Sequence, residues 1–142
     1  MKKFKEKLVI TGLTAAIMVT TIFAKPIYAN EVSGDCQYGG GINAWTHGYL
    51  NLDDMGFNKK KVWMTAMLGG SDRATINSTY TVSIHYKQLI TGKKKKQTIK
   101  SGTLSFNNEK DSLNGKGVKS STYVSNLIID CGSNHLDLES RV

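Results

Sequence analysis

Hydrophobic and polar side chains alternate most regularly between Thr75 and Ile90. The odd positions of this stretch are polar from Thr75 to Lys87, whereas bulky side chains dominate the even ones: Ile76, Ser78, Tyr80, Val82, Ile84 and Tyr86. Because successive side chains of a strand point to opposite faces, the alternation predicts a long strand with one buried face and one exposed face. Its β-branched and aromatic residues suit a pleated, half-buried surface. The rest of the chain must supply partners for the apolar face.

Similar but shorter patterns predict further strands on both sides of this one. Residues 44–52 alternate weakly, and residues 62–68 carry apolar side chains on both faces, with a length that also allows a short helix. Residues 97–106 predict a more polar strand. Residues 118–131 end in apolar side chains on both faces, which indicates a central place in a sheet. Residues 132–142 can add a short edge strand through two leucines.

Turn signals separate these segments. Residues 53–56 (Asp-Asp-Met-Gly) and residues 69–72 (Gly-Gly-Ser-Asp) predict turns, and residues 91–96 predict the tip of a hairpin. Residues 30–41 are polar and rich in glycine, and residues 107–116 are charged, so both predict loops. No stretch after residue 29 has a helical period or a proline. Five or six strands with such turns predict one domain, residues 30–142, folded as an all-β, small antiparallel β-sandwich, immunoglobulin-like or related, with a small barrel as the alternative.

Residues 1–29 have the layout of a secretory signal peptide. Four lysines among the first seven residues precede an uncharged apolar run, residues 8–24, and residues 25–29 end in the small Ala29. This order predicts export and cleavage after Ala29, with Ala24 as a second cleavage point. An uncleaved membrane anchor is the competing interpretation, because the run approaches the minimum length of a span. Pro26 and the threonines within the run favour cleavage.

Composition and cysteine count then refine the exported domain. Residues 30–142 carry 14 Lys and Arg against 10 Asp and Glu, a moderate positive charge that weakly favours anionic partners. The two cysteines, Cys36 and Cys131, lie near opposite ends of the domain. An even count in an oxidising compartment predicts a disulfide, which in the chain-entropy model stabilises a domain with so long a loop by about 4–5 kcal/mol at most. Two independent buried thiols are the alternative.

No catalytic or metal-binding motif is present. His47, His85 and His135 are scattered, and the chain has neither a Gly-x-Ser-x-Gly elbow nor a glycine loop for phosphate. A serine triad could still form in space, since triads depend on geometry rather than spacing. The pair Asp53-Asp54 offers too few oxygen ligands for a cation. The sequence therefore predicts a protein that is not an enzyme and has no cofactor, no metal site and no nucleic-acid partner.

A run of four lysines, Lys93, Lys94, Lys95 and Lys96, is the strongest charged feature. Four like charges cannot enter a core, so they are expected to crown a hairpin tip. There they can contact an anionic surface, either phospholipid headgroups or wall polymers. Alternatively they form a solvated turn that discourages edge-to-edge pairing of strands. Residues 59–61, three more lysines, can add to the same field if the fold brings them close.

The segment 39–49 combines three successive glycines with Trp45, His47, Gly48 and Tyr49. Glycines let the backbone approach another surface, and Trp, His and Tyr supply amphipathic contact area. A binding patch needs such a concentration of aromatic residues. In the alternative interpretation, the two aromatic rings only cap one end of the core.

The glycine-rich stretch running into Trp45-x-His47-Gly48-Tyr49 resembles the start of the lactococcin-type bacteriocins. The resemblance implies a small secreted β-sandwich protein that acts on Gram-positive neighbours by binding the cell-wall precursor lipid II and blocking septum formation. It covers one short stretch. The chain departs from the family in its greater length, its cysteine pair and the lack of an aromatic-rich C-terminal end.

Together these features predict a secreted, non-catalytic binding protein of a Gram-positive-type bacterium that acts at the cell envelope on an anionic cell-wall or membrane component. Bacteriocin-like antagonism through lipid II is its specific version. The binding residues would be Trp45, His47, Gly48 and Tyr49 together with the lysine run, and the mature chain would have no transmembrane anchor. A secreted module that binds a protein or glycan is the alternative hypothesis, and a small hydrolase is the third.

Overall fold

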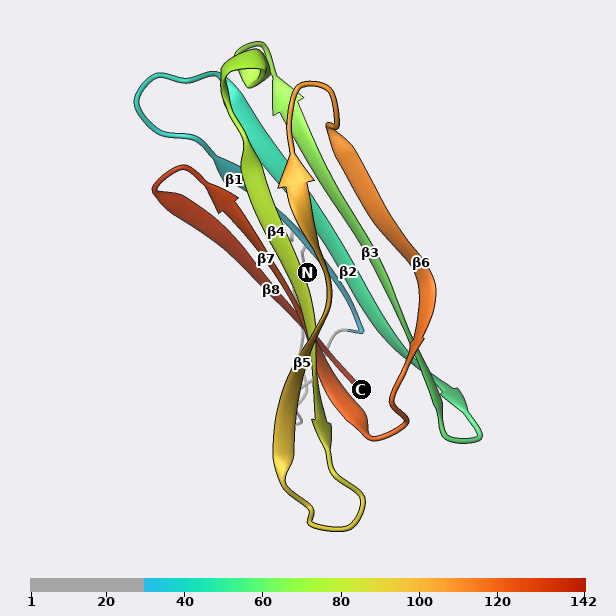
Figure 1. Cartoon of the computed structure of the whole chain (residues 1–142). Helices are drawn as coiled ribbons and strands as arrows, with labels where there is room; N and C mark the ends of the chain where they lie inside the picture. The colour runs from blue at the N-terminus through green and yellow to red at the C-terminus, as the bar shows by residue number, and fades with distance from the viewer. Residues whose placement is uncertain (1–29) are drawn as a thin grey trace, which may run out of the picture.

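The computed structural model describes residues 30–142, and the predicted signal peptide lies outside the described residues. Eight strands form two four-stranded antiparallel sheets that pack face to face (Figure 1). The strands are β1 (Glu31–Gln37), β2 (Ala44–Gly56), β3 (Lys59–Gly70), β4 (Ser78–Lys87), β5 (Lys94–Leu104), β6 (Lys110–Val118), β7 (Thr122–Cys131) and β8 (Asn134–Arg141). One sheet has the order β1-β2-β3-β6 and the other the order β5-β4-β7-β8. The predicted two-layer, all-β sandwich is thus confirmed.

The strand order is not that of an immunoglobulin constant domain. There the second and third strands lie in different sheets, whereas β1, β2 and β3 follow one another in one sheet. The chain crosses to the second sheet after β3, through a single 3₁₀ turn, η1 (Arg73–Thr75). It then forms the β4–β5 hairpin, returns to the first sheet as β6, and crosses again into β7 and β8. The sandwich is therefore of a related kind, with another topology.

The alternating stretch is β4, and its burial follows the predicted faces. Tyr80, Val82 and Ile84 are buried, and their odd-numbered neighbours are mostly more exposed. Ser83 is an exception, because it is buried although it lies on the other face of the strand. The strand is shorter than predicted: its first residues lie in and after η1, and the chain leaves the sheet after Lys87.

Two segments predicted as loops form strands: β1 lies within residues 30–41, and β6 begins within residues 107–116 and extends to Val118. Both lie at the edges of the first sheet and pair on one side only. Because most of their side chains face solvent, their sequences lack the alternation that marks a half-buried strand. Central β7 and edge strand β8 lie where the pattern predicted them.

The turn predicted at residues 53–56 is also displaced. These residues continue β2, and the turn is formed by Phe57 and Asn58, with φ angles of 51° and 60°. Positive φ at both central residues is the type I′ geometry, whose twist matches that of the flanking strands. Asn tolerates this conformation, but Phe is a rare residue there. The fold itself therefore gives no reason for a phenylalanine at position 57.

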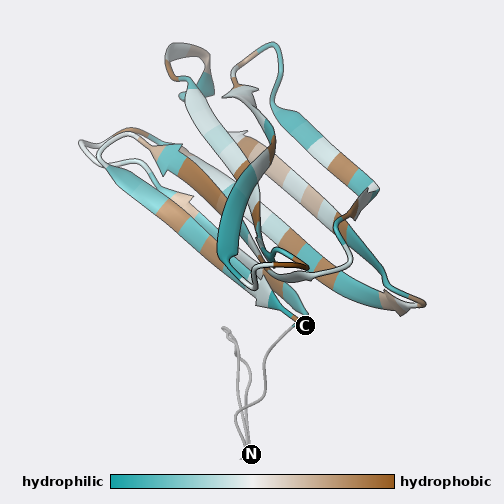
Figure 2. Ribbon diagram, turned by 60° about the horizontal axis from the view of Figure 1, so that its bottom comes forward, coloured by the Kyte–Doolittle hydropathy of each residue, from teal (hydrophilic) through white to brown (hydrophobic). Residues whose placement is uncertain are grey.

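The core lies between the sheets, where inward-facing residues of both layers meet. Figure 2 shows the corresponding apolar bands along the strands, alternating with hydrophilic ones. The largest fully buried side chain of this core is that of Tyr80 on β4. The first sheet contributes Leu50, Leu52 and Met64. Complete burial of such a side chain contributes about 1.5–3 kcal/mol.

The sandwich has two ends that differ in their connections. We call the end with the β2–β3, β4–β5 and β6–β7 turns the basic end; β1 begins there and β8 ends there. The opposite end carries the β1–β2, β3–β4, β5–β6 and β7–β8 connections. Neighbouring strands are antiparallel, so turns separated by many residues in sequence are brought together at each end.

Candidate functional site

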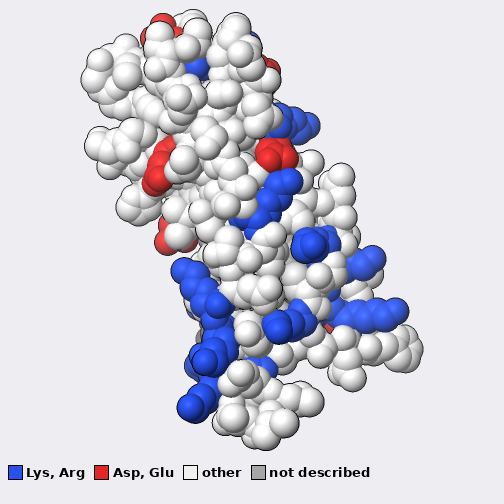
Figure 3. Space-filling view, in the orientation of Figure 1, with Lys and Arg blue, Asp and Glu red and all other residues white. Residues whose placement is uncertain are grey.

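Positive charge gathers at the basic end. Eleven of the 14 Lys and Arg residues of the described chain lie near it, against four of the 10 Asp and Glu: the cations are Lys59, Lys60, Lys61, Lys87, Lys93, Lys94, Lys95, Lys96, Lys116, Lys119 and Arg141. Figure 3 shows this concentration in the lower half of the view, with most acidic groups above it. The fold thus turns a modest net charge into a strong separation of charge along the sandwich, which can orient the protein toward an anionic surface.

The predicted lysine run is divided between a loop and a strand. Lys93 ends the loop, and Lys94 begins β5 directly opposite Lys87 of β4. Like charges facing each other across two strands destabilise a sheet. Among residues 30–142, no carboxylate oxygen lies within 4.0 Å of the ammonium nitrogen of any of residues 93–96. The run therefore presents uncompensated positive charge to solvent.

Aromatic rings hold two of the cations at this end. The ammonium of Lys94 lies 5.6 Å from the centre of the Tyr123 ring, and that of Lys119 lies 4.5 Å from the centre of the Tyr86 ring. Such cation–π contacts contribute about 0.5–1 kcal/mol when exposed. They orient each lysine without neutralising its charge.

Exposed apolar side chains occupy the tips of two hairpins at the same end. Leu89 and Ile90, in the β4–β5 loop, are 92% and 97% exposed, and Phe57, in the β2–β3 turn, is 96% exposed. The sequence predicted a strand that continues to Ile90, and the structure corrects this, because β4 ends at Lys87. Sequence reasoning missed all three as candidates, because their exposure depends on where the sheet ends and not on their spacing.

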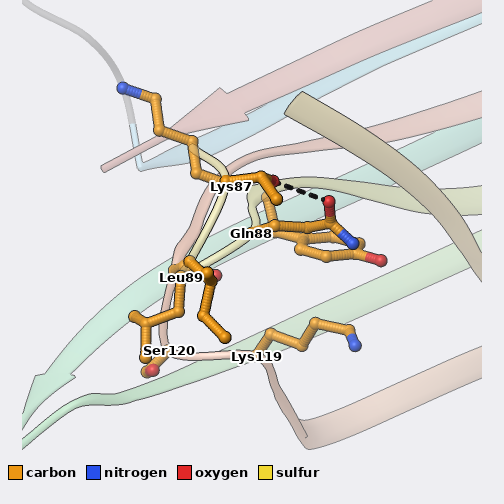
Figure 4. Close-up of a pocket in the computed structure, with 9 residues that line it drawn as sticks. Lys87, Gln88, Leu89, Lys119 and Ser120 are labelled. Carbon is orange, nitrogen blue, oxygen red and sulfur yellow. Dashed lines mark hydrogen bonds between the residues drawn. The ribbon is translucent and has the colours of Figure 1, made fainter. Parts of the chain in front are cut away.

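A hollow of about 510 Å³ lies between the β4–β5 loop and the β6–β7 turn. Its walls are residues 86–91 on one side and residues 119–121 on the other. Figure 4 shows the amines of Lys87 and Lys119 pointing away from each other around it. The backbone carbonyl of Ser121 accepts a hydrogen bond from the amide of Lys87, 3.3 Å away. The hollow forms part of an open, amphipathic surface.

The predicted aromatic site lies elsewhere, on the outer face of the first sheet. Trp45, His47 and Tyr49 alternate along β2 with buried residues and are themselves half-buried. Trp45 lies over the neighbouring β3, where a Cβ at Gly69 would come within 2.3 Å of its ring. Gly48 points inward, where a Cβ would meet Leu136 at 3.0 Å. This glycine therefore allows close packing between the sheets.

His47 and Tyr49 are also engaged within the fold. His47 Nδ1 lies 2.6 Å from Asp35 Oδ1, and the Tyr49 hydroxyl donates to Glu31 Oε2 at 2.7 Å. Burial, together with the hydrogen bond to Glu31, raises the pKa of Tyr49 to about 12. Asp35 and Glu31 belong to β1, so both contacts fasten this edge strand to β2. The two side chains have a structural task that the sequence did not reveal.

The structure does not bring the two predicted halves of the site together. Trp45 pairs with Gly69 near the opposite end, whereas Lys94 belongs to the second sheet at the basic end. Lys59, Lys60 and Lys61, in contrast, lie at the same end as the lysine run, as the sequence allowed. Lys60 donates to the backbone carbonyl of Ser120 at 2.6 Å, which ties the β2–β3 hairpin to the β6–β7 turn.

Cys36 and Cys131 meet between the sheets, 2.6 Å apart, and both are buried. They are free cysteines in this structure, so the predicted disulfide is not observed. The hydroxyl of Thr46 lies 2.9 Å from the sulfur of Cys131. Burial raises the pKa of the Cys131 thiol to about 12. The approach of Cys36 on β1 to Cys131 on β7 brings together the two residues that the sequence predicted as partners.

The histidines do not converge on a site. His47 lies on the outer face of the first sheet, and His135 is exposed on β8. The ring of His85 lies near that of Tyr123, with the ring centres 6.4 Å apart and the ring planes inclined at 60°. Within residues 30–142, no group of three or more His, Cys, Asp or Glu side chains could hold a metal ion. The same residues include no helix long and apolar enough to cross a bilayer.

Comparison with known proteins adds no relative from which a function could be inferred. No protein-family model, no curated protein and no solved structure matches the chain.

Proposed function

We propose that this protein is a secreted, non-catalytic binding protein that attaches through its basic end to an anionic component of a Gram-positive-type cell envelope. The observation that carries the proposal is the concentration of lysines at one end of the sandwich, with residues 93–96 unpaired by any described acidic group. Each lysine near an anionic membrane contributes about 1 kcal/mol. Four or more such contacts suffice for reversible attachment that weakens as salt screens the charges.

Binding of labelled protein to Gram-positive cells and to their isolated envelopes tests this proposal. Lys95→Gln/Lys96→Gln removes two charges at the basic end, and Arg73→Gln/Lys110→Gln removes two at the opposite end. We expect the first variant to bind at least fivefold more weakly and the second to change binding less than twofold. Equal loss in both variants, or binding that is insensitive to added salt, contradicts the proposal.

The outer face of the first sheet supports a second candidate function, bacteriocin-like antagonism. There Trp45, Trp63 and Met67 are half-buried and offer a band of apolar surface on β2 and β3. In the family that residues 45–49 resemble, lipid II is the target. If the second candidate is right, the protein inhibits growth of Gram-positive indicator cells, added lipid II relieves the inhibition, and Trp45→Ala abolishes it. Binding without inhibition points instead to an interaction module for a protein or glycan.

We also propose that Cys36 and Cys131 form a disulfide in the exported protein. Their approach between the two sheets and the oxidising conditions met by an exported chain support this. The intact mass of the purified protein, before and after alkylation without reductant, tests it. We expect no alkylation in the unfolded, unreduced protein; two alkylated thiols contradict the bond.

A further inference from the structure

We infer that the anionic surface bound by the basic end is a phospholipid bilayer, and that Phe57, Leu89 and Ile90 enter the boundary between its headgroups and acyl chains. The inference rests on the proposed function and names the partner of the same end.

The three apolar side chains have no function within the fold. Phe57, Leu89 and Ile90 are each more than nine-tenths exposed, and none belongs to the core or packs against it. Phe57 also has a φ of 51°, a conformation that Asn or Gly adopts more readily. Single exposed apolar residues are common on soluble proteins. Here, two separate hairpins present three of them at one end, beside most of the lysines of the described chain.

The lysines lie directly behind these tips. Lys59, Lys60 and Lys61 follow Phe57 in β3, while Lys87 precedes and Lys93 follows the Leu89–Ile90 loop. Apolar side chains that project beyond a group of lysines match the layers of an anionic membrane, where acyl chains lie beneath negatively charged headgroups. Leu89 and Ile90 also line the hollow between the β4–β5 loop and the β6–β7 turn. A soluble wall polymer would engage the lysines but would leave the three apolar side chains exposed to water, so the bilayer fits both features.

The chain also enters the fold at this end. The amide of Leu52, near the β2–β3 hairpin, donates to the carbonyl of Asn30 at 3.0 Å. The segment 1–29, whose sequence contains the apolar run 8–24, therefore joins the sandwich on the side that would face the membrane.

Vesicle binding by residues 30–142, which contain every described strand and the core, tests the inference. The probes are vesicles of phosphatidylcholine alone and vesicles with about one-third phosphatidylglycerol. We expect binding to the anionic vesicles only, weakened at least tenfold in Leu89→Ala/Ile90→Ala and about threefold or more in Phe57→Ala. The matched control is Phe106→Ala, which removes an apolar side chain that is 51% exposed at the opposite end and should change binding less than twofold.

Insertion itself has a separate readout. Ile90→Trp should show a blue-shifted emission on anionic vesicles and quenching by brominated lipid, whereas Phe106→Trp should show neither. Circular dichroism and thermal melting establish that each variant folds; the replaced residues at the basic end are exposed, so unchanged melting is expected.

The outcomes separate this inference from the proposed function. If Lys95→Gln/Lys96→Gln binds weakly but Leu89→Ala/Ile90→Ala binds normally, attachment is electrostatic only and the inference is overturned. Binding to isolated teichoic acid without binding to vesicles overturns it too, while the proposed function stands. A dimer that depends on Leu89 and Ile90, with no vesicle binding, replaces the bilayer by a second copy of the chain. No binding to any anionic material rejects both proposals.

Discussion

The two ends of this sandwich differ in their side-chain contacts and in their exposed surface. At the opposite end, the two sheets are joined through side chains: Cys36 meets Cys131, and the Tyr80 hydroxyl donates to Asp111, which also pairs with Lys100 at 3.2 Å. At the basic end, like charges face each other and three apolar side chains stand in solvent. The contacts just named at the opposite end stabilise the fold, whereas the facing lysines and the exposed apolar tips of the basic end add little or oppose it. The difference predicts that stability and the proposed binding depend on different ends and respond to different mutations.

The contacts at the opposite end close both open edges of the sandwich. The cysteines join β1 to β7, and the cluster of Tyr80, Asp111 and Lys100 joins β4 and β5 to β6. Burial raises the pKa of Tyr80 well above its usual value, so its hydroxyl stays protonated and donates. That hydrogen bond is the main cause of the lowered pKa of Asp111.

The largest effect is expected at the cysteines. If the disulfide is present, Cys36→Ser/Cys131→Ser should lower the free energy of unfolding by about 2–5 kcal/mol, because the unfolded chain loses its constraint. Urea unfolding followed by circular dichroism measures this. Reductant should shift the wild-type midpoint toward that of the variant, and an unchanged wild-type midpoint contradicts the role given to the bond. Binding to anionic vesicles by the folded variant should be unaltered.

Tyr80→Phe should cost about 1–3 kcal/mol, because the carboxylate of Asp111 loses a hydrogen-bond donor while staying partly buried. The loss should depend on pH. Since the pKa of Asp111 is lowered in the folded state, its contribution is complete above the unfolded value, about 3.9, and is lost as pH falls through the folded value. Unfolding curves at several pH values below about 5 should show a smaller acid destabilisation in Tyr80→Phe than in the wild type. Parallel acid profiles would contradict the coupling.

A pair of glycine substitutions compares the two ends directly. A Cβ at Gly102 on β5 would come within 2.9 Å of the Tyr80 hydroxyl oxygen and 3.0 Å of its ring, so Gly102→Ala should cost about 1–3 kcal/mol. A Cβ at Gly117 on β6, near the basic end, would meet nothing within 4 Å. Gly117→Ala should be neutral or stabilising by up to about 1 kcal/mol. Thermal melting of both variants measures the contrast, and similar shifts would show that the ends are packed alike.

The smallest effect on stability is expected at the lysine run. Lys95→Gln/Lys96→Gln should change the free energy of unfolding by no more than about 0.5 kcal/mol, in the stabilising direction, because like charges are removed from an exposed surface. The same variant should lose anionic binding. Chemical unfolding at low and high salt checks the first part: added salt should stabilise the wild type more than the variant. A destabilised variant would mean that these lysines support the fold.

Several features of the fold could be predicted because they depend on neighbours in sequence. The alternation in β4 identified its buried face, and the two-sided apolar end of β7 identified a central strand. β1 and β6 were missed, since an edge strand can fold with polar side chains on both faces. Of the proposed site, the lysine run could be found from the sequence alone, because four lysines follow one another. Phe57, Leu89 and Ile90 could not, because apolar residues in a sequence are expected to be buried.

The sequence by itself determined a β-rich domain, the buried faces of its central strands and a cluster of positive charge, because side-chain parity and composition are local properties. Only the tertiary structure decided which turns share an end, because the order and register of the strands depend on packing across the whole core. That packing put Phe57, the Leu89–Ile90 loop and three separate groups of lysines at one end of the sandwich. It also moved Trp45 and its neighbours to the outer face of one sheet, away from the lysines they were expected to accompany.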